Sequence, residues 1–170
     1  MTTLWHACAH ILAEGCELAE SLSSDFFRRT HPDCFDASIG THLRHCAEHF
    51  DCFRRGIESG VIDYDRRRRG TIEESDPRAA SRLLEDLATW FRERAAVGIE
   101  ASAVRVRVDS GHGANEAISS VERELQFLVS HTVHHFAIIA IMCRKMGVGL
   151  SPEFGVAPST LRYQEEEARV

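Results

Sequence analysis

Apolar residues return every three or four positions along four long segments of the chain, which is the spacing of helices that bury one face. Capping residues and glycines mark where these segments start and stop. We predict helices over residues 3–29, from an N-cap at Ser38 to Gly60, from an N-cap at Asp76 with Pro77 in the first turn, and from Ser119 to Gly147. Ser119 is followed three residues later by Glu122, so we expect the last helix to open with a capping box.

One short segment breaks the helical spacing. In "AVRVRVD" (103–109) valines alternate with arginines, the pattern of a half-buried strand, and the following "SGHGAN" favours a turn. Four amphipathic helices predict an all-α protein, a four-helix bundle, as one domain over residues 1–170, with a short strand or irregular segment between helices three and four. Pro152 and Pro158 forbid a continuous helix near the end, so we expect residues 149–170 to form an irregular tail across the bundle.

Composition narrows the class of protein. The net charge of −6 argues against a nucleic-acid partner, because phosphates select a basic face. No apolar run approaches the roughly 20 residues of a membrane span, and the N-terminus does not resemble a secretory signal, so we expect no membrane partner and a cytoplasmic location. The 6 cysteines lack C-x-x-C spacing and are expected to be reduced core residues. The run of arginines at 66–69 is expected to be a solvated loop balanced by acidic neighbours.

Histidines crowd the last predicted helix in "SHTVHHFAII" (130–139). A helix turns by about 100° per residue, so His135 falls in the middle of the apolar stripe, His131 on its edge one turn earlier, and His134 away from both. His131 and His135 therefore form an inward-facing H-x-x-x-H pair. His6 and His10 have the same spacing in the first helix, but their phase is opposite to the apolar stripe and predicts exposure to solvent.

The second predicted helix carries His42, His45 and His49 on one flank beside its apolar stripe. Helical phase places His42 and His49 nearer the core than His45, so periodicity does not decide which ring meets the pair on the last helix. Buried imidazoles lose free energy without a hydrogen-bond partner, and a divalent metal would satisfy several of them at once. Three neutral histidines plus water leave an open coordination position, which is the layout of a catalytic site.

The segment "SIGTHLRHCAEHF" (38–50) together with "SHTVHHFAII" resembles the DinB-like superfamily of four-helix bundles, close to its YfiT-type metal-dependent hydrolases. The resemblance covers nearly the whole chain. It implies that His45 joins His131 and His135 around one divalent metal, with His49 supporting these ligands or serving as an alternate one. Glu124 lies on the inward face of the last helix, two turns before His131, and is a second candidate for such a supporting role.

Family members with an assigned function include thiol-dependent transferases and isomerases. The resemblance thus implies a metal-dependent thiol transferase or hydrolase acting on a small-molecule thiol or electrophile. Imidazole ligands suit zinc first, with nickel or iron as alternatives. The rival hypothesis is a non-catalytic metal-binding or dimerising interaction module, because the apolar residues Ile138, Ile139 and Ile141 would suit a homodimer contact. The pattern identifies no general base.

Overall fold

Four long helices form the body of the protein. The computed structural model describes residues 2–34, 36–97, 103–109 and 111–169. The long helices are α1 (Thr2–Ser21), α3 (Ile39–Ile57), α4 (Pro77–Val97) and α5 (Val121–Lys145). The shorter elements are α2 (Ser24–Arg28), η1 (Pro32–Cys34), β1 (Val61–Asp63), η2 (Ile72–Glu74), β2 (Ala103–Asp109), β3 (Ala114–Ser120) and α6 (Pro158–Glu167).

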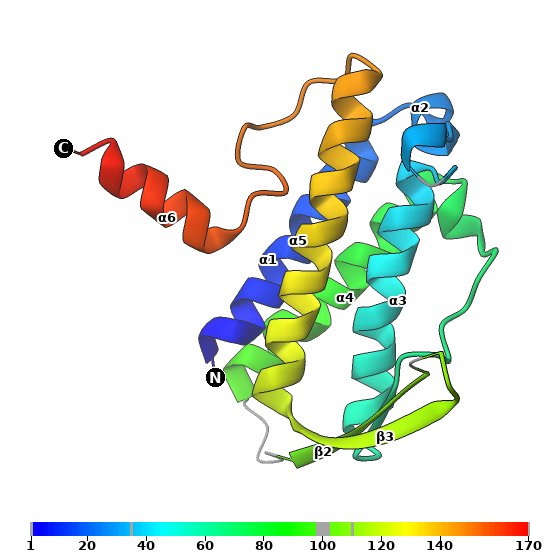
Figure 1. The fold of residues 1–170 in the computed structure, drawn as a ribbon, viewed down its shortest axis with the longest axis vertical. Helices are drawn as coiled ribbons and strands as arrows, with labels where there is room; N and C mark the ends of the chain where they lie inside the picture. The colour runs from blue at the N-terminus through cyan, green and yellow to red at the C-terminus, as the bar shows by residue number, and fades with distance from the viewer. Residues whose placement is uncertain (1, 35, 98–102, 110, 170) are drawn as a thin grey trace.

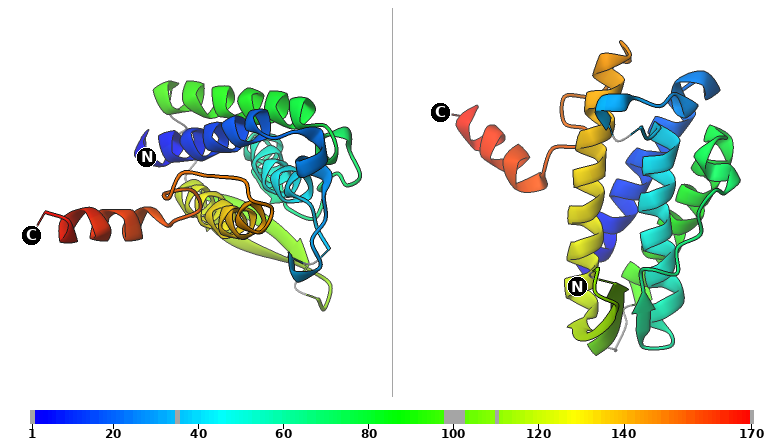
Figure 2. Two further views of the ribbon diagram at one scale, coloured as in Figure 1. Left: turned by 90° about the horizontal axis from the view of Figure 1, so that it is seen from above. Right: turned by 45° about the vertical axis from the view of Figure 1, so that its right-hand side comes forward.

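Each long helix packs mainly against two others. α1 contacts α4 and α5, and α3 contacts the same two helices from the opposite corner of the bundle (Figure 2). α1 and α5 run upward in Figure 1, whereas α3 and α4 run downward. The core contains an aromatic cluster in which the ring centroid of Phe91 lies 5.5 Å from that of Trp5 and 5.7 Å from that of Phe53. The predicted four-helix bundle is confirmed.

The parallel order of α3 and α4 requires a crossover between them. After α3 the chain forms β1, and residues 64–71 return along the side of the bundle to η2 (Figure 1). Ion pairs at two levels follow from the parallel arrangement: Arg54 to Asp86 at 2.6 Å and Arg94 to Glu58 at 3.5 Å. The crossover therefore returns the chain to the end of the bundle at which α3 began.

A small sheet closes one end of the bundle. β1 pairs in parallel with β2, and β2 pairs antiparallel with β3. The strand predicted within residues 103–109 is present as β2, with Val104 buried. β3 was not predicted because most of its side chains face solvent, so its sequence "ANEAISS" carries no apolar alternation. The bundle is thus extended by three strands rather than one.

The first predicted helix is broken, which corrects the expectation of one helix over residues 3–29. α1 ends at Ser21, and Ser23 caps the separate helix α2 by accepting a hydrogen bond from the Phe26 N–H. A serine side chain that captures a backbone N–H competes with the helical ladder and starts a new helix.

The predicted start of the last helix is wrong by one residue. The N-cap of α5 is Ser120, whose side chain accepts from the Arg123 N–H at 3.2 Å. Ser119 is not the cap, because its hydroxyl donates to the Glu124 carboxylate instead. The expected capping box is therefore replaced by a simple serine cap.

The C-terminal segment differs from the predicted irregular tail. Pro158 stands in the first turn of the helix α6, where its missing N–H leaves no hydrogen bond unmade. α6 projects away from the bundle rather than crossing it (Figure 1). The preceding segment does lie on the bundle, since the ring of Phe154 stacks on Phe136 with centroids 4.7 Å apart.

Among the described helices, α5 contains a long apolar window. By length and composition alone it would also suit a membrane span, which the sequence pattern did not indicate. Of the three residues expected at a homodimer contact, Ile139 is fully buried, Ile138 is partly buried and Ile141 is 46% exposed. The apolar surface on α5 is smaller than expected because Ile139 belongs to the core.

Gly40 permits a close approach at the start of α3. A β-carbon at this position would overlap the backbone oxygen of Glu74 and the ring of Phe27. We expect Gly40→Ala to lower the free energy of unfolding by about 1–3 kcal/mol, the usual effect of overpacking, measured by urea denaturation. In the control Gly149→Ala, the new β-carbon meets nothing within 4 Å, and the change should stay below about 0.5 kcal/mol. Equal stability of the two variants would contradict this close approach.

Candidate metal centre

Two neighbouring helices place five histidines opposite one another. α3 and α5 run antiparallel and in contact, so His42, His45 and His49 on successive turns of α3 face His135 and His131 on α5. Ring centroids are 5.2 Å apart for His42 and His135, 5.0 Å for His45 and His131, and 4.1 Å for His49 and His131. The two histidine segments found in the sequence therefore form one cluster.

Three of these rings direct a nitrogen toward a common point. His131 Nε2 lies 3.2 Å from His45 Nε2 and 3.2 Å from His135 Nε2, and the three atoms lie within 4.8 Å of one another. Two nitrogens bound to one zinc ion at about 2.0–2.1 Å in tetrahedral geometry are about 3.3 Å apart. The spacing therefore fits a single divalent cation, and imidazole donors are accepted by zinc, nickel and iron alike.

The protein environment keeps these three imidazoles neutral. Burial, together with the neighbouring histidines, lowers the pKa of His45 to about 2 and those of His131 and His135 to about 3. A neutral imidazole offers a lone pair, whereas a protonated one cannot bind a metal. At neutral pH all three rings are therefore in the form that a cation requires.

His42 holds the ring of His135 from behind. Its Nδ1 lies 2.9 Å from Nδ1 of His135, so one of these two nitrogens carries the shared hydrogen. With that hydrogen on His135, the Nε2 lone pair of His135 is free to point into the cluster, the arrangement common to metal-binding histidines. His42 is buried and its own Nε2 has no hydrogen-bond partner among the described residues.

His49 has no nitrogen left for a metal. Its Nε2 accepts a hydrogen bond from Arg67 Nη1 at 2.9 Å, because an arginine can only donate. Its Nδ1–H donates to the backbone oxygen of His45 at 2.8 Å. Burial first, and then the charge of Arg67, help to lower the pKa of His49 to about 4. Of the two roles expected for His49, the geometry favours support of the ligands over an alternate ligand.

The other sequence candidates do not direct a donor atom into the cluster, although the ring of His134 touches that of His135 with centroids 5.3 Å apart. His134 is exposed on α5, and His6 and His10 are exposed on α1, as their helical phase predicted. Glu124 is buried, but its oxygens accept from Tyr64 at 2.9 Å and from Ser119, not from a histidine. Glu124 therefore reaches the cluster only indirectly, through the ring of Tyr64, which stacks on His49.

On α3, helical phase predicted the buried histidines correctly but did not identify the histidine whose ring meets His131. His42 and His49 are 6% and 4% exposed, whereas His45 is only partly buried. His45 nevertheless meets His131, because α5 lies beside α3 and faces its flank rather than its most buried stripe. The resemblance to the DinB-like pattern, and not the periodicity, indicated His45.

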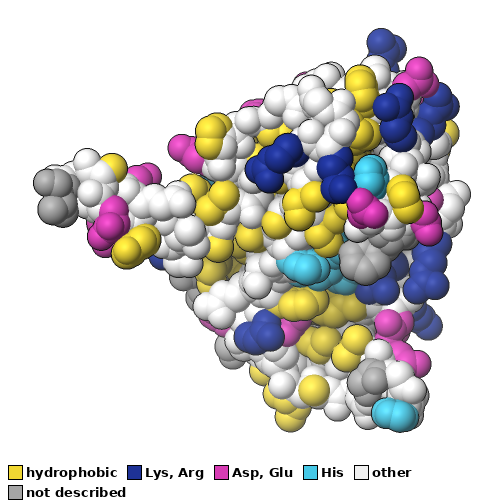
Figure 3. All heavy atoms as spheres, turned by 45° about the horizontal axis from the view of Figure 1, so that its top comes forward, with side chains coloured by type: hydrophobic (Ala, Val, Ile, Leu, Met, Phe, Trp, Pro, Cys, Tyr) yellow, Lys and Arg dark blue, Asp and Glu magenta, His cyan; other side chains and the backbone are white. Residues whose placement is uncertain are grey.

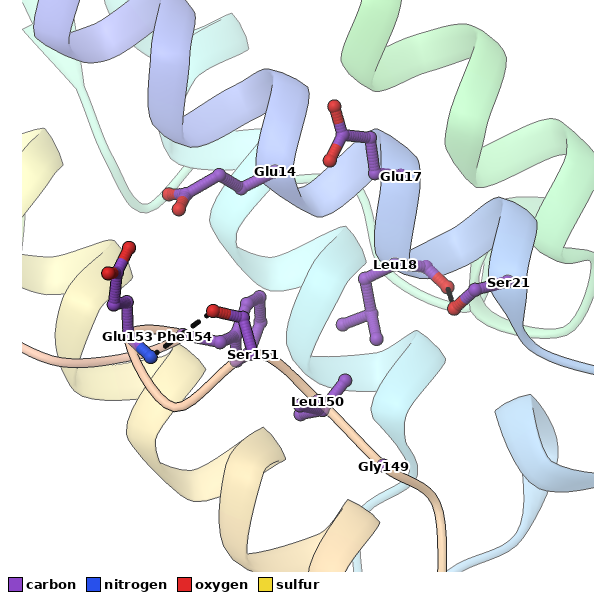
Figure 4. Close-up of a pocket in the computed structure, with 9 residues that line it drawn as sticks. All are labelled: Glu14, Glu17, Leu18, Ser21, Gly149, Leu150, Ser151, Glu153 and Phe154. Atoms are coloured by element: carbon purple, nitrogen blue, oxygen red, sulfur yellow. Dashed lines mark hydrogen bonds between the residues drawn. The ribbon is translucent and has the colours of Figure 1, made fainter.

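The cluster is open to solvent along the contact between α3 and α5. His45, His131 and His135 are each partly exposed. Figure 3 shows histidine side chains at the surface among hydrophobic ones, with Lys and Arg side chains beside them. A separate pocket of about 270 Å³ between α1 and residues 149–154 contains acidic and apolar side chains and no histidine (Figure 4). Among the described residues, the histidine cluster is the group whose donor atoms lie close enough together to hold a metal ion.

The arginine run is not the uniformly solvated loop that its sequence predicted. Arg68 pairs with the buried carboxylates Glu48 at 3.1 Å and Asp51 at 3.7 Å, both on α3. Arg67 is partly buried and turns toward His49. The carboxylates that pair with Arg68 come from α3 and not from the sequence next to it. The local sequence pattern therefore could not show that Arg67 differs from its neighbours.

Comparisons with known proteins leave the sequence family open. No protein-family model matches the chain. FK506-binding protein 5 from Rhizopus delemar is 28% identical over 109 residues, which are 63% of this chain and 28% of that protein. The chain thus spans a little over a quarter of the length of this relative.

Comparison of structures is more informative. YfiT from Bacillus subtilis, described as a probable metal-dependent hydrolase with an unusual four-helix bundle topology, superposes with a TM-score of 0.64 at 18% identity. The match covers 86% of this chain and 87% of YfiT. At this identity the likeness concerns the fold. The chain therefore has the YfiT fold, as the resemblance found in its sequence implied.

Proposed function

We propose that this protein is a metal-dependent enzyme in which His45, His131 and His135 hold one divalent cation. The observation that carries the proposal is the convergence of their three Nε2 atoms, with two separations of 3.2 Å, from helices far apart in the sequence. YfiT is described as a probable metal-dependent hydrolase, and its likeness over most of the chain supports the same class here.

The number of donors favours a catalytic over a structural role. Within the described part of the chain, the cluster offers three converging donors and no cysteine or carboxylate as a fourth. Structural zinc sites are closed by four protein ligands, whereas catalytic sites keep a position for water or substrate. The partial exposure of all three rings leaves that position accessible, which disfavours the purely structural metal module.

The reaction class follows from what the site can and cannot supply. A divalent cation bound here would lower the pKa of a water or thiol and polarise a substrate oxygen. The chain itself offers no reactive thiol, since all six cysteines are buried, and burial raises the pKa of Cys46 to about 12 and those of Cys52 and Cys143 to about 11. The nucleophile therefore comes from water or a small-molecule thiol, giving a hydrolase or a thiol transferase.

A hydrogen bond fixes the ring of His135, and packing restrains the ring of His131, whose buried Nδ1 has no hydrogen-bond partner among the described residues. His42 holds Nδ1 of His135, so that Nε2 points into the cluster. His49 is fixed by the His45 carbonyl and by Arg67, and its ring packs on His131. Rings held in this way lose little freedom on binding a cation. Zinc is the first candidate, with nickel or iron as alternatives.

Metal analysis tests the ligand set. Protein purified without chelator and then titrated with zinc should bind about one equivalent per chain. His135→Ala should abolish this binding, because two imidazoles are left, and His45→Ala and His131→Ala should do the same. The measurement is elemental analysis after dialysis.

His6→Ala is the matched control, because His6 also belongs to an H-x-x-x-H pair on a long helix but is exposed. It should leave the zinc content unchanged. Loss of zinc from His6→Ala, or its retention by His135→Ala, would contradict the proposed site.

The lowered pKa values predict how metal affinity depends on pH. Because the pKa values of His45, His131 and His135 lie near 2–3 in the folded protein, protons do not compete with a cation between pH 8 and 6. We expect the dissociation constant for zinc, measured by chelator competition, to change by less than about threefold over this range. Histidines with an unshifted pKa near 6.5 would instead lose affinity steeply below pH 7. A loss of tenfold or more between pH 7 and 6 would contradict the neutral cluster.

The same lowered pKa values predict that acid destabilises the folded, metal-free protein. Unfolded histidines bind protons near pH 6.5, whereas these folded ones do not until pH is far lower, so the unfolded state binds more protons in between. The free energy of unfolding is therefore unaffected by these histidines above about pH 6.5, and it decreases as the pH falls below that value and the unfolded histidines take up protons. The urea midpoint of the metal-free protein should therefore decrease from pH 7 to pH 5.

A further inference from the structure

Arg67 stands beside the histidine cluster with part of its guanidinium unused. Its Nη1 donates to His49 Nε2 at 2.9 Å. Its Nε is buried and has no hydrogen-bond partner among the described residues. A buried donor without an acceptor is unfavourable, because the group has lost water and gained nothing in exchange. An acceptor that reaches this edge, after a small movement of the partly exposed side chain, would satisfy the unpaired donor.

Four arginines near Arg67, three of them on α3 and the fourth Arg68 in the loop, are already paired with carboxylates. Three acidic side chains, two of them buried on α3 and one in η2, take up these charges; the pairs are Arg44 with Glu74, Arg54 and Arg55 with Asp51, and Arg68 with Glu48 and Asp51. Arg67 forms no ion pair with any described residue. Arg69 likewise forms no ion pair with a described residue, but Arg69 is exposed to solvent, whereas Arg67 is partly buried.

The loop that carries Arg67 is fixed in place. The backbone N–H of Arg68 donates to Glu48 Oε2 at 2.9 Å, and the N–H of Gly70 donates to Glu74 Oε1 at 3.2 Å. Glu74 in turn receives Arg44 at 2.7 Å. Both of these anchors follow Arg67, and before it the Tyr64 N–H donates to the backbone oxygen of Arg107 at 3.2 Å. Because the backbone is held before and after Arg67, little ordering is needed when a ligand binds, and preorganised groups bind more tightly.

Arg67 lies one ring away from the metal ligands. The His49 ring, to which it donates, has its centroid 4.5 Å from that of His45 and 4.1 Å from that of His131. The charge of Arg67 contributes to lowering the pKa of both rings, which agrees with this proximity. A small molecule with one group at the histidine cluster could therefore place a second group on Arg67.

We propose that the substrate of this site carries an anionic oxygen group, a carboxylate or a phosphate, that Arg67 binds while another part of the molecule approaches the metal. This inference rests on the proposed metal site and specifies the substrate class. The planar guanidinium edge matches such oxyanions, with two parallel N–H donors for two oxygens. Arg67 is thus a specificity residue, and an uncharged substrate of the same shape binds less well.

The test compares two thiols of equal length on the cobalt-loaded protein. 3-Mercaptopropionate has a carboxylate where 3-mercapto-1-propanol has a hydroxyl, and binding of either is followed by the change in the cobalt absorption spectrum. A charged, partly buried hydrogen bond corresponds to about a tenfold or larger difference in affinity. We expect wild type to prefer the carboxylate by this factor and Arg67→Gln to lose the preference. Inorganic phosphate, added as a competitor, identifies which oxyanion Arg67 binds better.

The controls separate the charge of Arg67 from its neighbours and from the metal. Arg69→Gln removes the same charge from an exposed position and should keep the preference. Arg67→Lys retains the charge and should keep part of the preference for the carboxylate. It also serves as the test variant if Arg67→Gln does not fold. If the cobalt-loaded protein binds 3-mercaptopropionate and phosphate with an affinity that does not change in Arg67→Gln, or changes equally in Arg69→Gln, the anion site is overturned and the metal site stands. Failure of wild type to bind cobalt overturns both.

Discussion

The lateral contact between α3 and α5 is the constraint on which the rest of the site depends. Because the two helices are antiparallel neighbours, residues spaced by one turn on one helix meet residues spaced by one turn on the other. This pairing sets His42 against His135 and His45 against His131 without any loop taking part. The histidines of the cluster stand on helices, and their mutual distances are therefore fixed by the packing of the core beneath them, where Phe136 and Leu128 are buried.

The crossover between α3 and α4 brings charged side chains next to the histidine cluster. In a bundle whose consecutive helices all alternate in direction, short turns would join them at the ends. Here α3 and α4 are parallel, so a connecting segment must travel the length of α3, and the buried acids Glu48 and Asp51 hold it there through Arg68. The parallel order of α3 and α4 thus carries Arg67 to the flank of α3 that holds the histidines. The acids that stabilise the loop are paired with other arginines, so Arg67 has no carboxylate partner among the described residues.

Much of the fold and part of the site could be read from the sequence. The period of apolar residues found the four long helices, and helical phase correctly turned His131 and His135 toward α3. His135 was expected in the middle of the apolar stripe, but it is partly exposed, and the neighbouring Phe136 is the buried residue. Helix boundaries were predicted wrongly where the sequence offers more than one possible cap. Ser23 divides the first helix, and Ser120 rather than Ser119 caps the last. His45 was identified only through the family resemblance. Helical phase predicts which residues are buried, but it does not tell which helix packs beside a given flank. Arg67 could not be singled out, since its partner His49 and the carboxylates that occupy its neighbours come from another helix.

The neutral histidines and the unpaired arginine fit together electrostatically. Imidazoles lose their charge on burial, so three of them can be grouped without mutual repulsion, but they bring no negative charge to balance a divalent cation. Arg67 adds a positive charge on the same side, and the nearby carboxylates are already occupied by other arginines. In a partly desolvated site, charges of one sign interact more strongly than in water. A cation held by three neutral ligands beside an unpaired guanidinium therefore leaves an excess of positive charge, which only an anionic ligand or substrate can compensate.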